Sequence, residues 1–185
     1  FNGRANITSV DIGNSVITIG DYAFRGCTSL TEVTIPDSVT SIGERAFLFC
    51  GALTAVTIGN SVISIGVHAF FGCGSLTAVT IPDSVTTIGE EAFYECTSLA
   101  AVTIKDQKQI TVQTNSFGTV NNSTINFYNT ANSAALESNW LAIANKFSNK
   151  KYSATLDGYE FTRAEGENEQ LVKETVDDYF KIELP

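Results

Sequence analysis

Apolar residues recur along roughly the first two thirds of the chain at a constant interval of 23 positions. Three positions in each interval carry an aliphatic side chain in every copy. The columns are Ile7, Leu30, Leu53, Leu76 and Leu99; Val10, Val33, Val56, Val79 and Val102; and Ile12, Ile35, Ile58, Ile81 and Ile104. A fixed period of this length is typical of stacked structural repeats, in which each unit buries its apolar side against its neighbours.

The pattern inside one copy predicts two short elements joined by turns. Val33 and Ile35 lie two positions apart, which predicts a strand with one buried face, and a Pro or Gly then ends that strand. After a turn that begins at Asp37, Val39 and Ile42 lie three positions apart. This spacing predicts the inward side of either a second short strand or a helical turn. An Ala-Phe dipeptide near the end of each copy then supplies a ring to the interior.

The four cysteines form a further column, Cys27, Cys50, Cys73 and Cys96, with the same interval of 23. Neighbouring coils would bring adjacent thiols within disulfide range, but stacked side chains point the same way, so a bridge would be strained. A straight column also lacks the converging directions that a zinc site needs. We therefore predict four reduced, buried thiols, and no metal or other cofactor.

The repeated sequence pattern resembles that of a known family. The pattern L-x-x-V-x-I-P-x-x-V-x-x-I-G-x-x-A-F-x-x-C is similar to the BspA-like class of leucine-rich repeats and extends over about residues 1–121. The resemblance implies an α/β solenoid, a right-handed coil with parallel strands and about five to six repeats. Members of this class are mostly bacterial cell-surface or secreted proteins, and several are linked to adhesion or host-matrix binding. The resemblance thus implies an extracellular or cell-surface location.

The repeat decays towards the C-terminus and gives way to a different pattern. Phe117 comes one residue late, after which Ile125 and Phe127 predict one more strand in register with Val102 and Ile104. Further on, the sequence predicts an amphipathic helix over Leu136, Trp140, Ile143 and Phe147, with Ser133 as its N-cap. A hairpin is predicted around Asp157-Gly158. It is followed by an acidic loop at 164–169, a weakly helical segment at 170–180 and an edge strand at 181–184. We predict a solenoid at 1–129, and a C-terminal helical and hairpin cap with an acidic extension at 130–185.

Composition narrows the range of partners. The formal net charge is −9, and no cluster of Lys and Arg suits phosphate binding, so a nucleic-acid partner is not expected. No apolar run approaches the ~20 residues of a membrane-spanning helix. The chain lacks Met and opens inside a repeat with no capping segment, so we expect it to be a fragment. An uncapped first coil is expected to fray or to associate edge to edge with another copy through the N-terminal end.

Candidate catalytic groups are sparse. His68, the one histidine, occupies a repeat position held elsewhere by Tyr22, Arg45 and Glu91, so we predict a solvent-facing imidazole without a carboxylate partner. The neighbouring pairs of acidic residues tend to point apart on a strand or helix, so neither predicts an acid/base pair. Phosphate-binding, serine-hydrolase and zinc-protease motifs are absent from the sequence. We therefore expect no enzymatic activity.

Two outward columns remain as candidate binding surfaces. One is a flat strand face of small residues, and the other follows the buried Phe of each copy. The candidate residues are Glu32, Thr34, Thr57, Thr80 and Thr103 on the first, and Arg25, Leu48, Phe71 and Tyr94 on the second. Threonine also suits a solvent-facing strand without any function, and the second column could equally pack between coils. Exposed aromatics, in contrast, are favoured at interfaces.

These observations support two hypotheses of different classes. The first is a non-enzymatic binding module, an adhesin-like fragment that contacts an unidentified protein or glycan through the repeat surface. The alternative is a structural spacer, or an assembly piece of a larger protein, that projects another domain. A pull-down with host-matrix proteins and glycans distinguishes the two.

Overall fold

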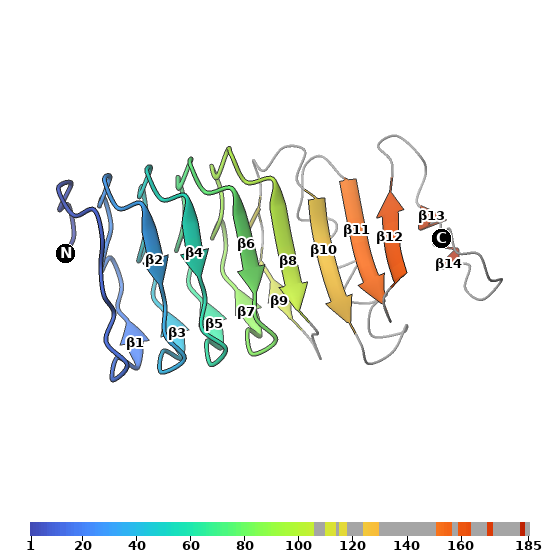
Figure 1. Cartoon of the computed structure of the whole chain (residues 1–185), viewed down its shortest axis with the longest axis horizontal. Helices are drawn as coiled ribbons and strands as arrows, with labels where there is room; N and C mark the ends of the chain where they lie inside the picture. Colours follow the sequence, from blue (N-terminus) through green and yellow to red (C-terminus); the bar gives the residue numbers. More distant parts are fainter. Residues whose placement is uncertain are drawn as a thin grey trace.

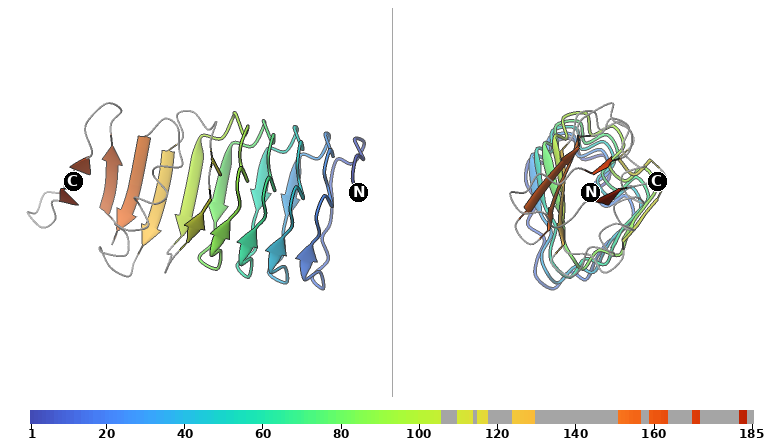
Figure 2. Two further views of the ribbon diagram at one scale, coloured as in Figure 1. Left: turned by 180° about the vertical axis from the view of Figure 1, so that it is seen from behind. Right: turned by 90° about the vertical axis from the view of Figure 1, so that its right-hand side faces the viewer.

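The computed structural model shows a stack of similar coils, most of which contribute one strand to a large sheet and a shorter strand to a second sheet (Figure 1). It describes residues 1–105, 110–113 and 115–117, together with the backbone of the strands at 124–129, 151–156, 159–163, 170–171 and 182–183. Seen along the stack, the coils superimpose as an oval ring (Figure 2).

The large sheet has seven strands in the order β12-β11-β10-β8-β6-β4-β2. Its repeat strands are β2 (Glu32–Thr34), β4 (Ala55–Thr57), β6 (Ala78–Ile81), β8 (Ala101–Lys105) and β10 (Thr124–Asn129). They pair in parallel and in the predicted register, with Val33 opposite Val56 and Val79 opposite Val102. Alternate residues point inward and are buried, as the period of two requires.

The second sheet shows that the predicted second element of each copy is a short strand and not a helical turn. Its strands, in the order β1-β3-β5-β7-β9, are β1 (Thr18–Ile19), β3 (Ser41–Ile42), β5 (Ser64–Ile65), β7 (Thr87–Ile88) and β9 (Thr111–Val112). Their buried members are Ile19, Ile42, Ile65, Ile88 and Val112. The described part of the repeats contains strands and turns and no helix, so the helical component of the predicted α/β solenoid is not confirmed there.

The third side of each coil consists of turns that bond to the next coil. The backbone N–H of Phe24 donates to the carbonyl of Ala46 at 2.7 Å, and that of Phe47 donates to Ala69 at the same distance. These bonds keep the Phe rings in a buried stack with neighbouring centroids 5.1 Å apart. The stack runs through Phe24, Phe47, Phe70, Phe93 and Phe117.

The cysteine column lies beside the ring stack. All four thiols are free and buried, as predicted. Each donates to the carbonyl oxygen of a Phe one coil earlier, for example Cys50 Sγ to Phe24 O at 3.2 Å and Cys73 Sγ to Phe47 O at 3.3 Å. Burial raises the pKa of the Cys50 and Cys96 thiols to about 12. A thiol is thus a suitable residue here, because it fills a small apolar site and still satisfies a buried carbonyl.

A glycine column allows the coils to approach closely. A Cβ placed on Gly66 would come within 2.7 Å of the backbone of Gly43, and one on Gly89 within 2.6 Å of the backbone of Gly66. Such distances are shorter than real Cβ contacts, so any side chain there would push neighbouring coils apart. This explains the glycines at 43, 66 and 89, whereas a Cβ on Gly20 would meet no atom within 4 Å and Gln113 occupies the equivalent position of the next coil.

The late position of Phe117 does not interrupt the stack. Ile104 still pairs with Ile81, 23 residues earlier, whereas Thr111 pairs with Thr87, 24 residues earlier. The extra residue therefore lies between Ile104 and Thr111. The rings of Phe93 and Phe117 remain 5.1 Å apart and nearly parallel, at 1°.

The C-terminal strands confirm part of the predicted pattern. β10 places Ile125 opposite Val102, as predicted, and β11 (Lys151–Leu156) adds in parallel to β10. β11 and β12 (Tyr159–Arg163) form the predicted antiparallel hairpin. β13 (Gln170–Leu171) pairs with β14 (Ile182–Glu183), so the expected edge strand is present, whereas a strand stands at the start of the segment predicted as weakly helical.

Two predictions for this end of the chain are untested by these strands. The amphipathic helix over Leu136, Trp140, Ile143 and Phe147, and the acidic loop at 164–169, lie outside the described residues. The domain boundary between 129 and 130 also stays a prediction. At the opposite end, Ile7, Val10 and Ile12 are only partly buried, and the large sheet begins with β2 of the following copy.

Candidate binding surfaces

The first candidate surface is the outer face of the large sheet. We call it the strand face and define it by the outward residues of β2, β4, β6 and β8. Thr34, Thr57 and Thr80 are exposed and Thr103 is partly buried, and all four lie in register across hydrogen-bonded strands. In the neighbouring column, Glu32 is followed by Ala55, Ala78 and Ala101. The strand face therefore presents hydroxyl and methyl groups in rows, with one carboxylate at its N-terminal end.

The second candidate column is divided between the surface and the interior. Arg25 is exposed, and its guanidinium lies 3.4 Å from the side-chain oxygen of Asn2. Leu48 is only 8% exposed, so it packs with the core and offers little to a partner. Phe71 and Tyr94 are half-buried and stack on each other with centroids 5.3 Å apart. The structure thus brings Phe71 and Tyr94 together at the surface, whereas Leu48 is buried.

An aromatic residue that the column analysis missed completes this surface. Phe49 has a φ of +59°, in the left-handed region, and occupies the repeat position of Gly26 and Gly72, which also have positive φ. Its ring lies over Gly72, where an added Cβ would come within 2.5 Å of Phe49 Cδ1. It also meets Phe71 edge to face, at 5.6 Å and 88°. The signal was present in the sequence, because Phe49 interrupts a column of glycines.

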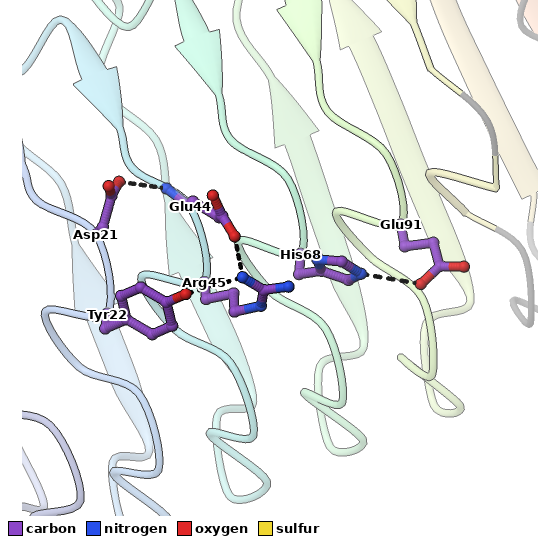
Figure 3. Close-up of polar contacts among 6 residues, drawn as sticks. All are labelled: Asp21, Tyr22, Glu44, Arg45, His68 and Glu91. Carbon is purple, nitrogen blue, oxygen red and sulfur yellow. Dashed lines mark hydrogen bonds and ion pairs between the residues drawn. The ribbon is translucent and has the colours of Figure 1, made fainter.

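His68 lies at the edge of the same cluster, and its predicted lack of a partner is wrong. Its Nε2 is 3.0 Å from a carboxylate oxygen of Glu91, at the same repeat position one coil later (Figure 3). Its ring centroid is 5.5 Å from that of Phe71. Its Nδ1 is buried and has no hydrogen-bond partner among the described residues. The half-buried imidazole is therefore held between a carboxylate and a ring.

The same repeat position forms a second cluster two coils earlier. Arg45 donates to the hydroxyl of Tyr22 at 2.8 Å, lies over the Tyr22 ring and also pairs with Glu44 (Figure 3). The side chain of Asp21 accepts the backbone N–H of Glu44 at 2.8 Å. Tyr22, Arg45 and His68 all have φ between 55° and 57°. One backbone conformation thus presents a different side chain in each coil.

Two further observations describe the chemistry that these surfaces hold. Within the described residues, no three His, Cys, Asp or Glu side chains are grouped as a metal site would require. The described residues also form no helix of the length and apolarity needed to cross a membrane.

Comparison with known sequences identifies the repeat. Residues 1–123 match the BspA type leucine rich repeat region, in six copies. The chain belongs to the BspA-type leucine-rich repeat family. No curated protein matches the chain significantly.

Solved structures of bacterial leucine-rich repeat proteins share its architecture. A Treponema pallidum leucine-rich repeat protein is 26% identical, with a TM-score of 0.58, over 64% of this chain and 58% of that structure. A leucine-rich cell surface protein from Faecalibacterium prausnitzii is 32% identical, with a TM-score of 0.61, over 74% of this chain and 35% of that structure. The pneumococcal vaccine antigen PcpA, at 16% identity and a TM-score of 0.62, shares the fold over 80% of this chain and 41% of its own. The BspA-type chain therefore spans less than two thirds of each of these three structures.

Proposed function

We propose that the chain is a non-enzymatic binding module of a bacterial surface or secreted protein, which contacts a protein or a glycan through its repeat surface. The observation that supports this most is the strand face. Thr34, Thr57 and Thr80 expose their side chains in register across strands that hydrogen bonds hold in place. A partner would meet a surface whose geometry is set before binding.

The chemistry of the strand face suits recognition at low cost in conformational entropy. Alanine has no side-chain rotamers to lose on binding, and threonine has few. The hydroxyl groups can donate and accept hydrogen bonds, which suits both polypeptide and sugar partners. A side chain that is already restrained before binding loses little entropy on binding, so more of the contact energy contributes to affinity.

The relatives support the proposed location. One structural relative is described as a leucine-rich cell surface protein, and another as a vaccine antigen. Together with membership of the BspA-type family, these descriptions favour an extracellular or cell-surface position for this chain.

A binding assay with matched charge variants tests the proposal. The chain would be applied to panels of immobilised host-matrix proteins and glycans as wild type, as Thr57→Arg/Thr80→Arg, and as Thr18→Arg/Thr111→Arg. The first pair adds two charges to the strand face, and the second adds two to exposed positions in the other sheet. We expect the first pair to weaken binding by about tenfold or more, because bulky charges break complementarity at the contact, and the second to leave it within about twofold.

Two results would contradict the proposal. Equal loss in both pairs would mean that the strand face is not the contact. Failure of the wild type to bind any member of the panels would favour the alternative, a structural spacer that projects another part of a larger protein.

A further inference from the structure

A second exposed surface carries a more specific chemistry than the strand face. The aromatic patch consists of Phe49, Phe71, Tyr94 and His68, which come from three successive coils. Ring contacts join them in sequence, with centroids 5.6 Å apart for Phe49 and Phe71, 5.3 Å for Phe71 and Tyr94, and 5.5 Å for His68 and Phe71. Because each ring is fixed by its neighbours, the patch is ordered without a partner.

Phe49 is the residue of the patch that the fold least requires. Its repeat position has a left-handed backbone, which three other copies fill with Gly3, Gly26 and Gly72 and one fills with Glu95. A residue with a Cβ is less stable than glycine in this conformation. The Phe49 side chain nevertheless remains 48% exposed, so burial offsets only part of the cost. Backbone strain of this kind at an exposed aromatic residue motivates a search for a functional role.

Charge around the patch is predominantly negative. Residues 46–104 contain no Lys or Arg, and their four carboxylates are Asp83, Glu90, Glu91 and Glu95. Three of the four flank Tyr94 in the same turn, and Glu91 contacts His68 directly at 3.0 Å. Arg45, in the same coil as Phe49, already pairs with Glu44 and lies over the Tyr22 ring, and the other arginines of the described repeats, Arg4 and Arg25, lie in earlier coils. The potential at the patch therefore favours a cation.

Aromatic faces beside carboxylates are suited to a guanidinium group. Arginine stacks its planar guanidinium on aromatic rings and pairs with carboxylates through a rigid fork of donors, and it is only weakly hydrated. Neutral sugars also stack on rings and can donate hydroxyl hydrogen bonds to carboxylates, but they gain no charge–charge attraction there. We propose that the aromatic patch is a docking surface for an arginine-rich polypeptide segment, whose guanidinium groups lie against Phe49 and Phe71 and face the carboxylates beside Tyr94.

This surface is distinct from the strand face, so either can bind, or fail to bind, without the other. The probe is a blocked peptide with three arginines spaced by glycines, compared with the same peptide carrying citrulline, which has nearly the same shape and no charge. Affinity would be measured by titration calorimetry in low and high salt. We expect the citrulline peptide to bind about tenfold more weakly or worse, and the arginine peptide to weaken as salt screens the carboxylates.

Two variants assign the binding to the patch. Phe49→Gly restores the residue used at three other copies, so it keeps the backbone conformation, and we expect about fivefold weaker binding of the arginine peptide with an unchanged or higher Tm. Ile63→Thr is the matched control, since Ile63 is 51% exposed and Thr40 and Thr86 occupy its repeat position. We expect the control to bind within about twofold of wild type.

Three outcomes would overturn the proposal. The first is equal affinity for the arginine and citrulline peptides, or no measurable binding of either. The second is equal affinity of Phe49→Gly and wild type. The third is binding of neutral glycans on a printed array that Phe49→Gly abolishes while the arginine peptide does not bind, which would assign the patch to a sugar. The strand-face variants Thr57→Arg/Thr80→Arg serve as a separate check, because they leave every residue of the aromatic patch unchanged.

Discussion

Two columns of the repeat share one spacing and differ completely in what they tolerate. The interior column is Phe in every copy, and its rings stack at 5.1 Å from Phe24 through Phe117. The exterior column, two residues earlier in each copy, reads Tyr22, Arg45, His68 and Glu91, although all four residues have φ between 52° and 57°. The buried ring thus sets the stacking, while the exposed position keeps its backbone whatever side chain it carries. Recognition can vary at the second column because the fold depends on the first.

The largest expected effect on stability comes from ionising the buried thiols of the interior. The pKa of the Cys50 and Cys96 thiols is raised from 9 to about 12 by burial, so the folded state keeps protons that the unfolded state loses near pH 9. Stability should therefore be full below pH 9 and fall as the pH rises from 9 to 12. A shift of about three pH units corresponds to roughly 4 kcal/mol for each thiol.

Urea unfolding at a series of pH values measures this loss. Cys50→Ala should lower the slope of stability against pH across the same window, and Thr57→Ala, which removes no titrating group, should leave it nearly unchanged. A wild-type stability that stays constant from pH 9 to 12 would contradict the burial of the thiols. Thiol titration at pH 8 should likewise find four groups only after denaturation.

Truncating one interior ring should have the next largest effect. Phe70 is fully buried between Phe47 and Phe93, so Phe70→Ala removes a stacked ring on both sides. We expect a loss of about 3–5 kcal/mol of unfolding free energy. The matched exterior variant, Phe49→Gly, should lose far less or gain. Similar losses for the two in denaturant unfolding would show that the interior and exterior columns do not differ as described.

Two glycines test whether close contact between coils, rather than the repeat pattern alone, requires glycine. Gly66→Ala would place a Cβ 2.7 Å from the Gly43 backbone, whereas Gly51→Ala meets no atom within 4 Å. We expect the first to cost about 1–3 kcal/mol, because neighbouring coils must shift, and the second to cost little. Thermal unfolding of both variants measures the difference, and a Tm for Gly66→Ala equal to that of Gly51→Ala would rule out the predicted contact between coils.

The smallest effect is expected at the exterior column itself. Glu91→Gln removes the charge that faces His68 and keeps the size of the side chain. A partly exposed pair of this kind contributes about 0.2–1 kcal/mol. The change in unfolding free energy should therefore stay below that of any interior variant. A loss above about 2 kcal/mol would place His68 and Glu91 among the residues on which the fold depends.

The sequence predicted the strands because the apolar positions encode them directly. A period of two within a period of 23 requires Val33 and Ile35 to face inward and to stack on Val56 and Ile58, and the same spacing places Ile125 opposite Val102. The hairpin of β11 and β12 follows from the turn residues between two strand-like segments. These features depend on local patterns, and the structure reproduces them.

The surfaces were less predictable because they depend on contacts between coils. Arg25, Leu48 and Phe71 share one repeat position, yet the first is exposed and the second is buried. The pair of His68 and Glu91 could have been predicted, because equal positions in adjacent coils lie one strand spacing apart. The role of Phe49 required the left-handed backbone, which the sequence shows only as an interrupted column of glycines.

The near identity of the copies has a consequence for inheritance. The segments 27–48 and 73–94 are so similar in wording that recombination between them would remove or add 46 residues, which is two whole coils. The joined chain would place equivalent residues on either side of the junction, so the ring stack and the glycine column would continue through it. The length of the coil stack can therefore change between generations by ~4.8 Å for each coil gained or lost, while the packing between coils stays the same.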